Sequence, residues 1–484
     1  MRTRRLRLFS LPGVDRIDPD LGPVSLTASA LAATADVQLT LAVADRPFKK
    51  PDELTWWDWT VFLLHTAAEI EHALMVQYLY AAYSLVPADG PFQGNAVPEN
   101  APDLIREWRR TILGIAREEM AHLLSIQNLL RFVGGPLNLE REDFPFRAYL
   151  YPFVLQLEPL TKTSLAKYVS AEMPAETDIP LEDRALIQEI IARAIGAVGG
   201  SAINRVGILY DALIDIFEDE TKLLNDDLRP QTVATLQADD ADDGWRRGFD
   251  SLLVRTVDSR KEAVDALKAI AEQGEGLQLP PASDDPSHYQ HFLDIYKIFP
   301  ETELPSGLPD WVPTRPVPRN PNTLPDTCTD SAMESSRITD PTTRLWAHLF
   351  NVRYRMLLLD LAHALHLSRP YEGPEDQPTP RGHLRAWAFQ EMTSGLRGIA
   401  NALTSLPLKE TLGTEQAGPP FELPYTFALP DIERDRWRLH LALLDTSQDI
   451  ITKIVAATGE HAVLTALKRI DAANRLIVTA QLIP

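Results

Sequence analysis

Glu119 and His122 form the pair of residues whose types and spacing most directly suggest chemistry. They lie three positions apart in an otherwise apolar stretch, so an α-helix would place both side chains on one face. Because carboxylates are rarely buried without partners, a buried face of this kind must meet a cation. A Glu-x-x-His element is typical of metal sites inside helix bundles. The competing interpretation is a solvent-exposed pair, since the same spacing arises by chance in many helices.

An upstream apolar stretch offers a second carboxylate. Glu71 and Tyr78 lie seven positions apart, which is two turns along one helix face. Glu69 and His72 offer another Glu-x-x-His pair on a different face, with His65 one turn earlier. Periodicity alone does not choose between the two faces, and a solvent-exposed pair is the simpler expectation for Glu69 and His72.

Long helices must position these residues. Apolar residues recur at helical spacing over 57–86, 102–134, roughly 183–222 and 257–273, and a mixed connection covers 139–176. Gly134 and Gly135 mark the end of the second stretch, and the first two helices are expected to be antiparallel. Four long helices with one long crossover predict a ferritin-like four-helix bundle, whose metal sites are built from inward-facing side chains.

The rest of the chain divides by composition. An alternating stretch within 24–46 predicts a short strand, and the segment after Pro300 is too rich in proline for a helix or a central strand. Helical periodicity returns at 345–367, 383–406 and 432–456. The predicted fold is mainly all-α and has four parts: a β-containing N-terminal arm at 1–55, the bundle with its metal site at 56–298, a Pro-rich linker at 299–341 and a C-terminal helical region at 342–484.

The composition limits the partners and cofactors. The 484-residue chain carries a formal charge of −21, which argues against nucleic-acid binding because that needs clustered Lys and Arg. Cys328 is the single cysteine, which excludes an intramolecular disulfide, a thiolate zinc site and an iron–sulfur cluster. A metal must therefore be bound by carboxylates and imidazoles. The basic start contains only a broken apolar run and no segment is long enough to span a membrane, so a cytoplasmic protein is expected.

Several motifs carry a resemblance to known proteins. E-x-x-x-x-x-x-Y in the first helix, and E-E-x-x-H followed by L-x-x-Q-N and G-G in the second, resemble the first helix pair of ferritins. This resemblance selects Glu71, Glu119 and His122 as metal ligands and places Tyr78 beside the metals. The stretches Y-L-Y-A-A-Y-S-L, F-V-G-G-P-L-N, V-G-I-L-Y-D-A-L and S-H-Y-Q-H-F-L-D-I-Y resemble the ferritin-like domain of iminophenyl-pyruvate dimer synthases over about residues 57–298.

The resemblance implies further metal ligands. It matches Glu275 in Q-G-E-G, His288 in S-H-Y-Q-H-F and Glu172 in S-A-E-M-P. Two hard cations need several oxygen and imidazole donors, and these residues would supply them. Without the resemblance, a solvated Glu275 and a capping or ion-paired Glu172 are the simpler interpretations.

The resemblance also implies an activity. A pair of iron ions bridged by glutamates can react with dioxygen, while the protein supplies position and excludes water. We expect a di-iron oxidase or oxygenase that acts on a small, amino-acid-derived metabolite in a biosynthetic pathway. Its metal site should connect to a cavity of roughly 300–1,000 Å³, with Tyr78 and Tyr210 as catalytic residues in the walls. The alternatives are an iron-binding, ferroxidase or structural protein, and a haem- or manganese-dependent enzyme that consumes peroxide. Whether the protein forms a homo-oligomer stays open.

Overall fold

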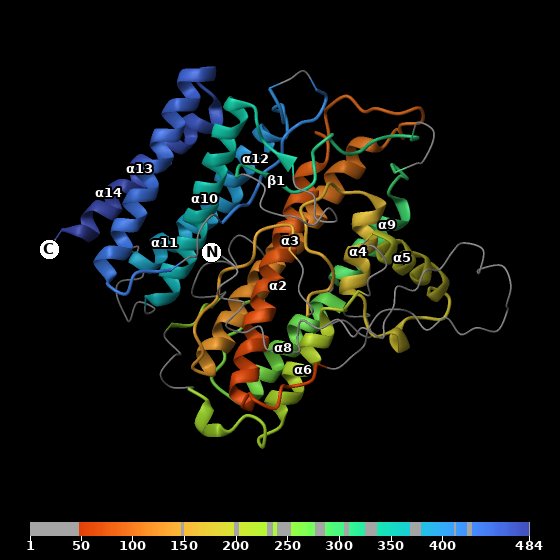
Figure 1. The fold of residues 1–484 in the computed structure, drawn as a ribbon, viewed down its shortest axis with the longest axis vertical. Coiled ribbons are helices and arrows are strands. Elements are labelled where there is room, and N and C mark those ends of the chain that lie inside the picture. Colours follow the sequence, from red (N-terminus) through yellow and green to blue (C-terminus); the bar gives the residue numbers. More distant parts are fainter. Residues whose placement is uncertain are drawn as a thin grey trace.

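Helices dominate the computed structural model (Figure 1). It describes residues 48–146, 150–197, 203–229, 236–239, 253–275, 286–303, 309–324, 336–367, 379–410, 413–423 and 428–483. The strand predicted within 24–46 and Cys328 lie outside these residues. In the described ranges, the only sheet pairs β1 (Pro321–Asn322) with β2 (Ser336–Arg337), so the mainly all-α prediction is confirmed. None of the helices in these ranges has the length and apolar character needed to cross a membrane.

The first two helices in the chain are the longest helices of the bundle. α2 (Trp56–Ser84) begins at a capping box, in which the side chains of Thr55 and Asp58 accept each other's backbone N–H. α3 (Ala101–Phe132) ends before Gly134, whose φ of +70° suits glycine. The two helices run antiparallel and side by side, as predicted for 57–86 and 102–134 (Figure 1).

The third position of the bundle is filled by two helices joined end to end. α4 (Lys162–Glu172) ends at Glu172, and α6 (Gly207–Glu218) begins beside that end. The N–H of Val206, just before α6, donates to the carbonyl of Ala171 in the last turn of α4 at 2.9 Å. The segment between them contains α5 (Arg184–Ala197), which packs its single apolar face against α4. The prediction of continuous helix over 183–222 is therefore wrong: α5 and α6 are separate, and α6 is the one that packs against α2.

The fourth position is interrupted in the same way. α8 (Arg260–Glu275) packs against α6, and α9 (His288–Ile298) packs against α4, while both contact α3. The predicted helix at 257–273 corresponds to α8. Both interruptions therefore occur where predicted metal ligands lie, at the ends of α4 and α8 and at the start of α9.

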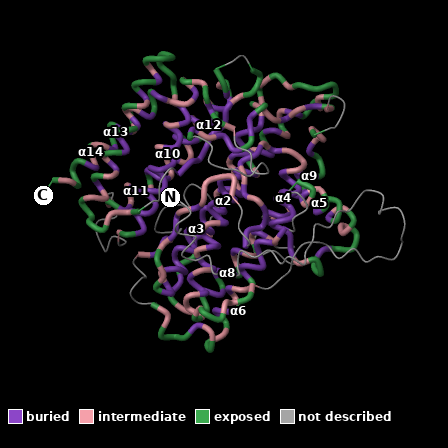
Figure 2. Tube along the Cα trace, viewed as in Figure 1, coloured by how far each residue is buried: buried purple, intermediate pink, exposed green. Residues whose placement is uncertain are grey.

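The C-terminal region is helical as predicted, with one helix more. α10 (Pro341–His366), α11 (Pro380–Gln390), a π-helical turn (Glu391–Leu396), α12 (Arg397–Leu403) and α13 (Glu433–Thr458) cover the predicted stretches, and α14 (Ala462–Leu482) follows them. The buried side of α14 includes Asp471 and Asn474, which interrupt its apolar periodicity. Oδ1 of Asp471 accepts a hydrogen bond from Nη1 of the buried Arg353 of α10 at 2.5 Å. Figure 2 shows that buried residues concentrate in α2, α3 and α10, whereas α14 exposes most of one side.

Several contacts attach the C-terminal part of the chain to the bundle, among them two that involve α2. On α2, His72 forms a hydrogen bond with Tyr354 of α10, and both rings are buried. The Pro-rich stretch lies against the C-terminal end of α2, where Arg315 N–H donates to the carbonyl of Ser84 at 2.7 Å. The proposed division into four parts stays a prediction.

Candidate metal centre

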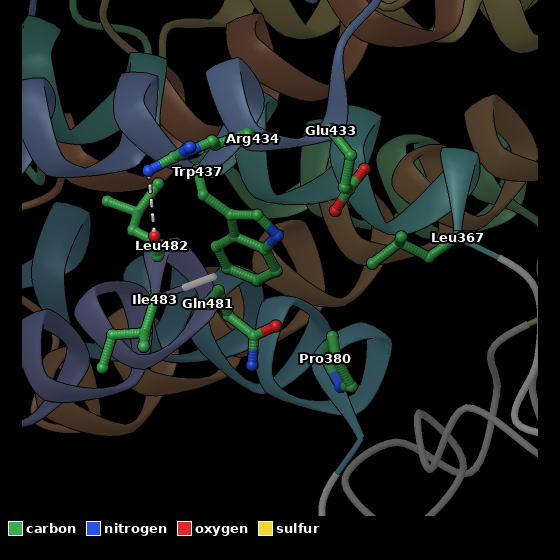
Figure 3. A pocket seen from close by; sticks show the side chains of 8 residues that line it. All are labelled: Leu367, Pro380, Glu433, Arg434, Trp437, Gln481, Leu482 and Ile483. Carbon is green, nitrogen blue, oxygen red and sulfur yellow. Dashed lines mark hydrogen bonds between the residues drawn. The ribbon is translucent and has the colours of Figure 1, made fainter.

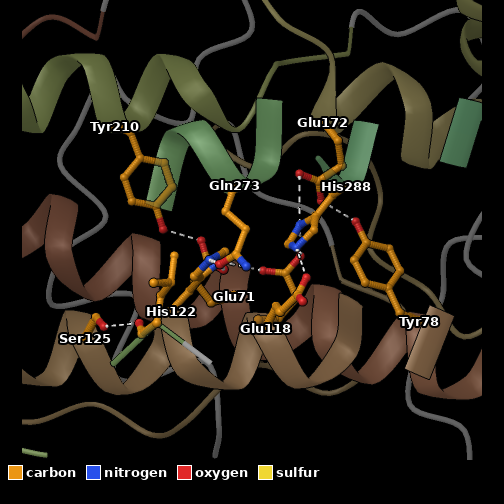
Figure 4. Close-up of polar contacts among 11 residues, drawn as sticks. Glu71, Tyr78, Glu118, His122, Ser125, Glu172, Tyr210, Gln273 and His288 are labelled. Carbon is orange, nitrogen blue, oxygen red and sulfur yellow. Dashed lines mark hydrogen bonds and ion pairs between the residues drawn. The ribbon is translucent and has the colours of Figure 1, made fainter. Parts of the chain in front are cut away.

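Two overlapping groups of carboxylates and imidazoles lie inside the bundle. The first triad consists of Glu71, Glu119 and His122, and the second triad of Glu119, Glu172 and His288. Within each triad, one donor atom of every residue lies within 4.8 Å of the others. All five residues are at most 3% exposed, so water does not solvate their charges. The structure thus brings together five of the six predicted metal ligands (Figure 4).

Glu119 belongs to both triads. Its Oε2 lies 3.1 Å from Nδ1 of His122, and its Oε1 lies 3.2 Å from Nδ1 of His288. One carboxylate therefore presents a separate oxygen to each triad, which is the arrangement that a bridging ligand between two cations requires.

A tyrosine holds the outer oxygen of each remaining carboxylate. Tyr210 donates its hydroxyl hydrogen to Oε1 of Glu71, and Tyr78 donates to Oε1 of Glu172 at 2.5 Å. The Oε2 atoms of both carboxylates face the imidazoles. Figure 4 shows the two tyrosines at opposite ends of this row of contacts. Their predicted catalytic role stays a prediction.

The junction between α4 and α6 creates an internal symmetry. Val206 takes the place of the fourth residue after Ala171 in a continuous helix, so Tyr210 stands in the seventh position after Glu172. This is the same spacing that separates the carboxylate from the tyrosine on α2. The carboxylate–tyrosine arrangement of α2 therefore recurs in space across two helices, where Glu172 and Tyr210 lie 38 positions apart in the sequence.

The second nitrogen of each imidazole has a partner that the sequence did not reveal. Nε2 of His122 lies 2.9 Å from Oε1 of Gln273, and Nε2 of His288 lies 2.9 Å from Oε2 of Glu118. Such partners fix the ring orientation of a ligating histidine. Glu118 could have been found as the neighbour of Glu119 on α3, whereas no local signal singles out Gln273.

Three donor atoms of this cluster lack hydrogen bonds. Oε2 of Glu71, Oε1 of Glu119 and Nδ1 of His288 are buried and make no hydrogen bond of acceptable geometry, although each lies 3.2–3.3 Å from a donor atom of a neighbouring triad residue. Buried polar atoms are normally paired, and these face one another across the triads. A pair of cations would satisfy all three, so the residues present fit a di-metal site.

The family comparison agrees with this geometry. The family model described as Ferritin-like matches residues 64–297. These residues form a ferritin-like domain. The match begins within α2 and ends within α9, and it includes all the residues of both triads.

Curated relatives of the chain are enzymes by name. Dichlorochromopyrrolate synthase of Lentzea aerocolonigenes is 27% identical over an alignment of 394 residues that covers 74% of this chain and 35% of that protein. The 2-imino-3-(indol-3-yl)propanoate dimerase of Chromobacterium violaceum is 25% identical over an alignment of 380 residues that covers 75% of this chain and 33% of that protein. The chain thus spans about a third of their length, and the matches confirm the resemblance that the motifs indicated.

A solved ferritin-like protein from Caulobacter vibrioides is also similar. It is 17% identical, with a TM-score of 0.41, and the alignment covers 72% of this chain and 95% of that protein.

Glu275 lies beside the triads of the ferritin-like domain but belongs to neither. Its Oε2 lies 3.2 Å from Nη1 of Arg205, while its buried Oε1 has no hydrogen-bond partner. It lines the same cavity as the triads, close to the first residue of α6. A Cβ atom on Gly207 would fall 1.5 Å from Oε1 of Glu275, so only glycine leaves room for this carboxylate. Glu275 stays a candidate sixth ligand.

The cavity inside the ferritin-like domain is small. The triad residues, Tyr210 and Glu275 line a cavity of about 10 Å³, roughly enough for one water molecule. Within the described residues, the site therefore encloses no cavity large enough for the expected organic molecule. A larger cavity of about 440 Å³ lies in the C-terminal region, beside Glu433 and Trp437 of α13 and the end of α14 (Figure 3). None of its lining residues belongs to the triads.

Glu69 and His72, the alternative pair on α2, face away from the triads. The expectation that they are exposed is wrong, because Glu69 accepts hydrogen bonds from Tyr151 at 2.5 Å and from Asn138 at 3.2 Å, while His72 pairs with Tyr354. Their hydrogen bonds pack the connection after α3 and the helix α10 onto α2.

Proposed function

We propose that the ferritin-like domain binds two iron ions and uses dioxygen to oxidise a small, amino-acid-derived metabolite. The proposal rests on one observation: two buried triads share Glu119, and three of their donor atoms lack hydrogen bonds. Carboxylate and imidazole donors without thiolates suit iron or manganese. Bound iron would supply redox chemistry with dioxygen, which side chains alone lack.

The chain's own residues would orient the ligands and keep water out. Tyr78 and Tyr210 each hold the outer oxygen of a carboxylate, which leaves the inner oxygen free to bind a cation. Glu118 and Gln273 fix the imidazole rings through Nε2, so that Nδ1 points inward. Burial of the whole cluster limits the access of water to a reactive centre.

The names of the relatives support an organic substrate. One relative is named for dimerising 2-imino-3-(indol-3-yl)propanoate, and the other for making dichlorochromopyrrolate. Both share about 25–27% identity with most of this chain. An aromatic amino-acid derivative is therefore the substrate class to test first, and lining side chains such as Tyr210 would have to move to admit it.

A second candidate function is iron oxidation without an organic substrate. The cavity of about 10 Å³ favours it, because the site has room for ions and small molecules but not for a metabolite. In that case the ferritin-like domain would bind and oxidise ferrous ions as its own substrate.

Metal affinity is expected to rise with pH. Burial opposes a charged imidazole, but the hydrogen bonds and charges of Glu119 and Glu71 outweigh it and raise the pKa of His122 to about 10. Burial, together with the charge of Glu119, raises the pKa of Glu71 to about 8 and that of Glu172 to about 7. The metal-free site therefore holds protons at pH 7 that each ion must displace. Titration with ferrous ion in weak buffer should release protons, and affinity should fall as the pH drops from about 8 to about 6. An affinity that does not change with pH would contradict this prediction.

The two candidate functions make different predictions. Metal analysis with an absorption spectrum first establishes two non-haem irons per chain; a Soret band would indicate haem instead. Indole-containing amino acids and imino acids are then titrated into the anaerobic di-ferrous protein. An oxidase should show a changed iron spectrum and, after dioxygen is added, an oxidised product. If no compound changes the spectrum while many ferrous ions per chain are oxidised and retained, iron oxidation without an organic substrate is the function.

A further inference from the structure

The two triads differ in what holds the outer nitrogen of their histidine. We propose that the two metal positions are unequal, and that Glu118 makes the second triad the tighter site, while Gln273 leaves the first triad the weaker one. This inference rests on the proposed di-metal function and concerns how its two positions are distinguished. It assigns Glu118 and Gln273 as positioning residues.

The inner donors of the two triads match. Each triad has one oxygen of Glu119, one imidazole Nδ1 and one carboxylate whose outer oxygen accepts a tyrosine hydroxyl. The number and the chemical type of these donors are the same. The difference in the histidine partner therefore stands out against a symmetric background.

The histidine partners differ in charge. When a cation occupies Nδ1, the imidazole proton sits on Nε2, so this nitrogen donates to Oε1 of Gln273 in the first triad and to Oε2 of Glu118 in the second. A hydrogen bond to a carboxylate is roughly twice as strong as one to a neutral amide oxygen. It also makes the imidazole a stronger base and hence a better ligand.

Burial preserves this difference. Glu118 is 9% exposed, so solvent screens its charge only weakly at the second triad. Arg117, its neighbour on α3, also interacts with the charge of Glu118, but this residue is only partly buried, so solvent screens its charge more than it screens Glu118. Glu275 lies outside both triads and pairs with Arg205 at 3.2 Å, so it is not one of the matched inner donors compared here.

The expected consequence is ordered loading. The first equivalent of a divalent ion should enter the second triad at His288, and the second equivalent should enter the first triad at His122. The extra carboxylate should also stabilise the more highly charged, oxidised ion at the second triad. One ion would then be retained while the other is exchanged more easily.

The test titrates the full-length, metal-free chain with Mn²⁺ alone. Free Mn²⁺ is followed by electron paramagnetic resonance, and binding heats are measured by calorimetry. The wild-type chain should bind two ions in separate steps, with affinities that differ by about 10-fold or more. His288→Ala should remove the tight step, whereas His122→Ala should retain it and lose the weak one.

An exchange of the two partners tests the cause. Glu118→Gln keeps a hydrogen-bond acceptor for His288 but removes the charge, so the tight step should weaken about 10-fold. Gln273→Glu should strengthen the weak step by a similar factor, and the double exchange should reverse the loading order. These Mn²⁺ affinities should change without loss of helical circular dichroism, which separates positioning from folding.

Several results would overturn the inference. Two equal binding steps, a tight step that survives in His288→Ala, or unchanged affinities in Glu118→Gln would each contradict unequal sites and leave the di-metal proposal intact. Absence of binding of both Mn²⁺ and, under anaerobic conditions, Fe²⁺ in the wild-type chain would contradict both proposals.

Discussion

Glu119→Gln is expected to abolish the binding of both metal ions. Its two carboxylate oxygens face different triads, so one substitution removes a charged donor from each position. Partners of ligating residues alone contribute about 10–100-fold in affinity, so loss of a shared ligand should cost each ion more than about 100-fold. The measurement is metal content after equilibrium dialysis against ferrous ion under anaerobic conditions.

Glu107→Gln is the matched control. Glu107 lies on α3 as well, but it is exposed and far along the helix from the triads, so the same chemical change should leave two ions per chain. Circular dichroism of the metal-free variants checks that both remain helical. Retention of two tightly bound ions by Glu119→Gln would rule out the shared ligand.

Gly207→Ala is expected to displace Glu275 and to weaken metal binding by roughly 10–100-fold. The new methyl group would occupy the position of the Glu275 carboxylate, 1.5 Å from its Oε1. Since the obstructing atom is the end of a flexible side chain, Glu275 can turn away. The stability cost should therefore stay below the ~1–3 kcal/mol typical of overpacked cores. Metal affinity and chemical denaturation, measured on the same samples, separate the two effects.

Gly196→Ala provides the control for this substitution. Gly196 lies in the helix α5 with no atom within 4 Å of an added Cβ, so alanine should leave metal affinity unchanged. It should also raise stability by up to ~1 kcal/mol, because alanine favours helix over glycine. If Gly207→Ala binds metal as the wild type does, Glu275 contributes nothing to the site.

The sequence predicted those parts of the site that lie within one helix. Glu119 and His122 share a face of α3, and Glu71 and Tyr78 share a face of α2, so helical spacing alone proposed both pairs. Spacing could not choose Glu71 over Glu69, because both have partners inside the fold: Glu71 faces the triads, and the partly buried Glu69 accepts a hydrogen bond from Tyr151. The resemblance to known families made that choice.

Contacts between distant segments could not be predicted in this way. The relation of Tyr210 to Glu172 exists only because α6 docks on the end of α4, which depends on tertiary packing rather than on local periodicity. Gln273 meets His122 across the bundle for the same reason. The apolar stretches of α5 and α6 likewise looked like parts of one helix, since periodicity does not reveal which partner each face contacts.

The end-to-end junction of α4 and α6 also matters for evolution and protein engineering. The segment between Glu172 and Gly207 leaves the helix axis and returns to it, so its length is not set by the bundle. New sequence could accumulate there without changing the register of the donors, provided that the Val206–Ala171 hydrogen bond persists. Leu181, 77% exposed in the turn before α5, marks a position where a peptide tag or a binding loop could be inserted. Diversification by insertion at this position would alter what surrounds the centre while its donors are inherited unchanged.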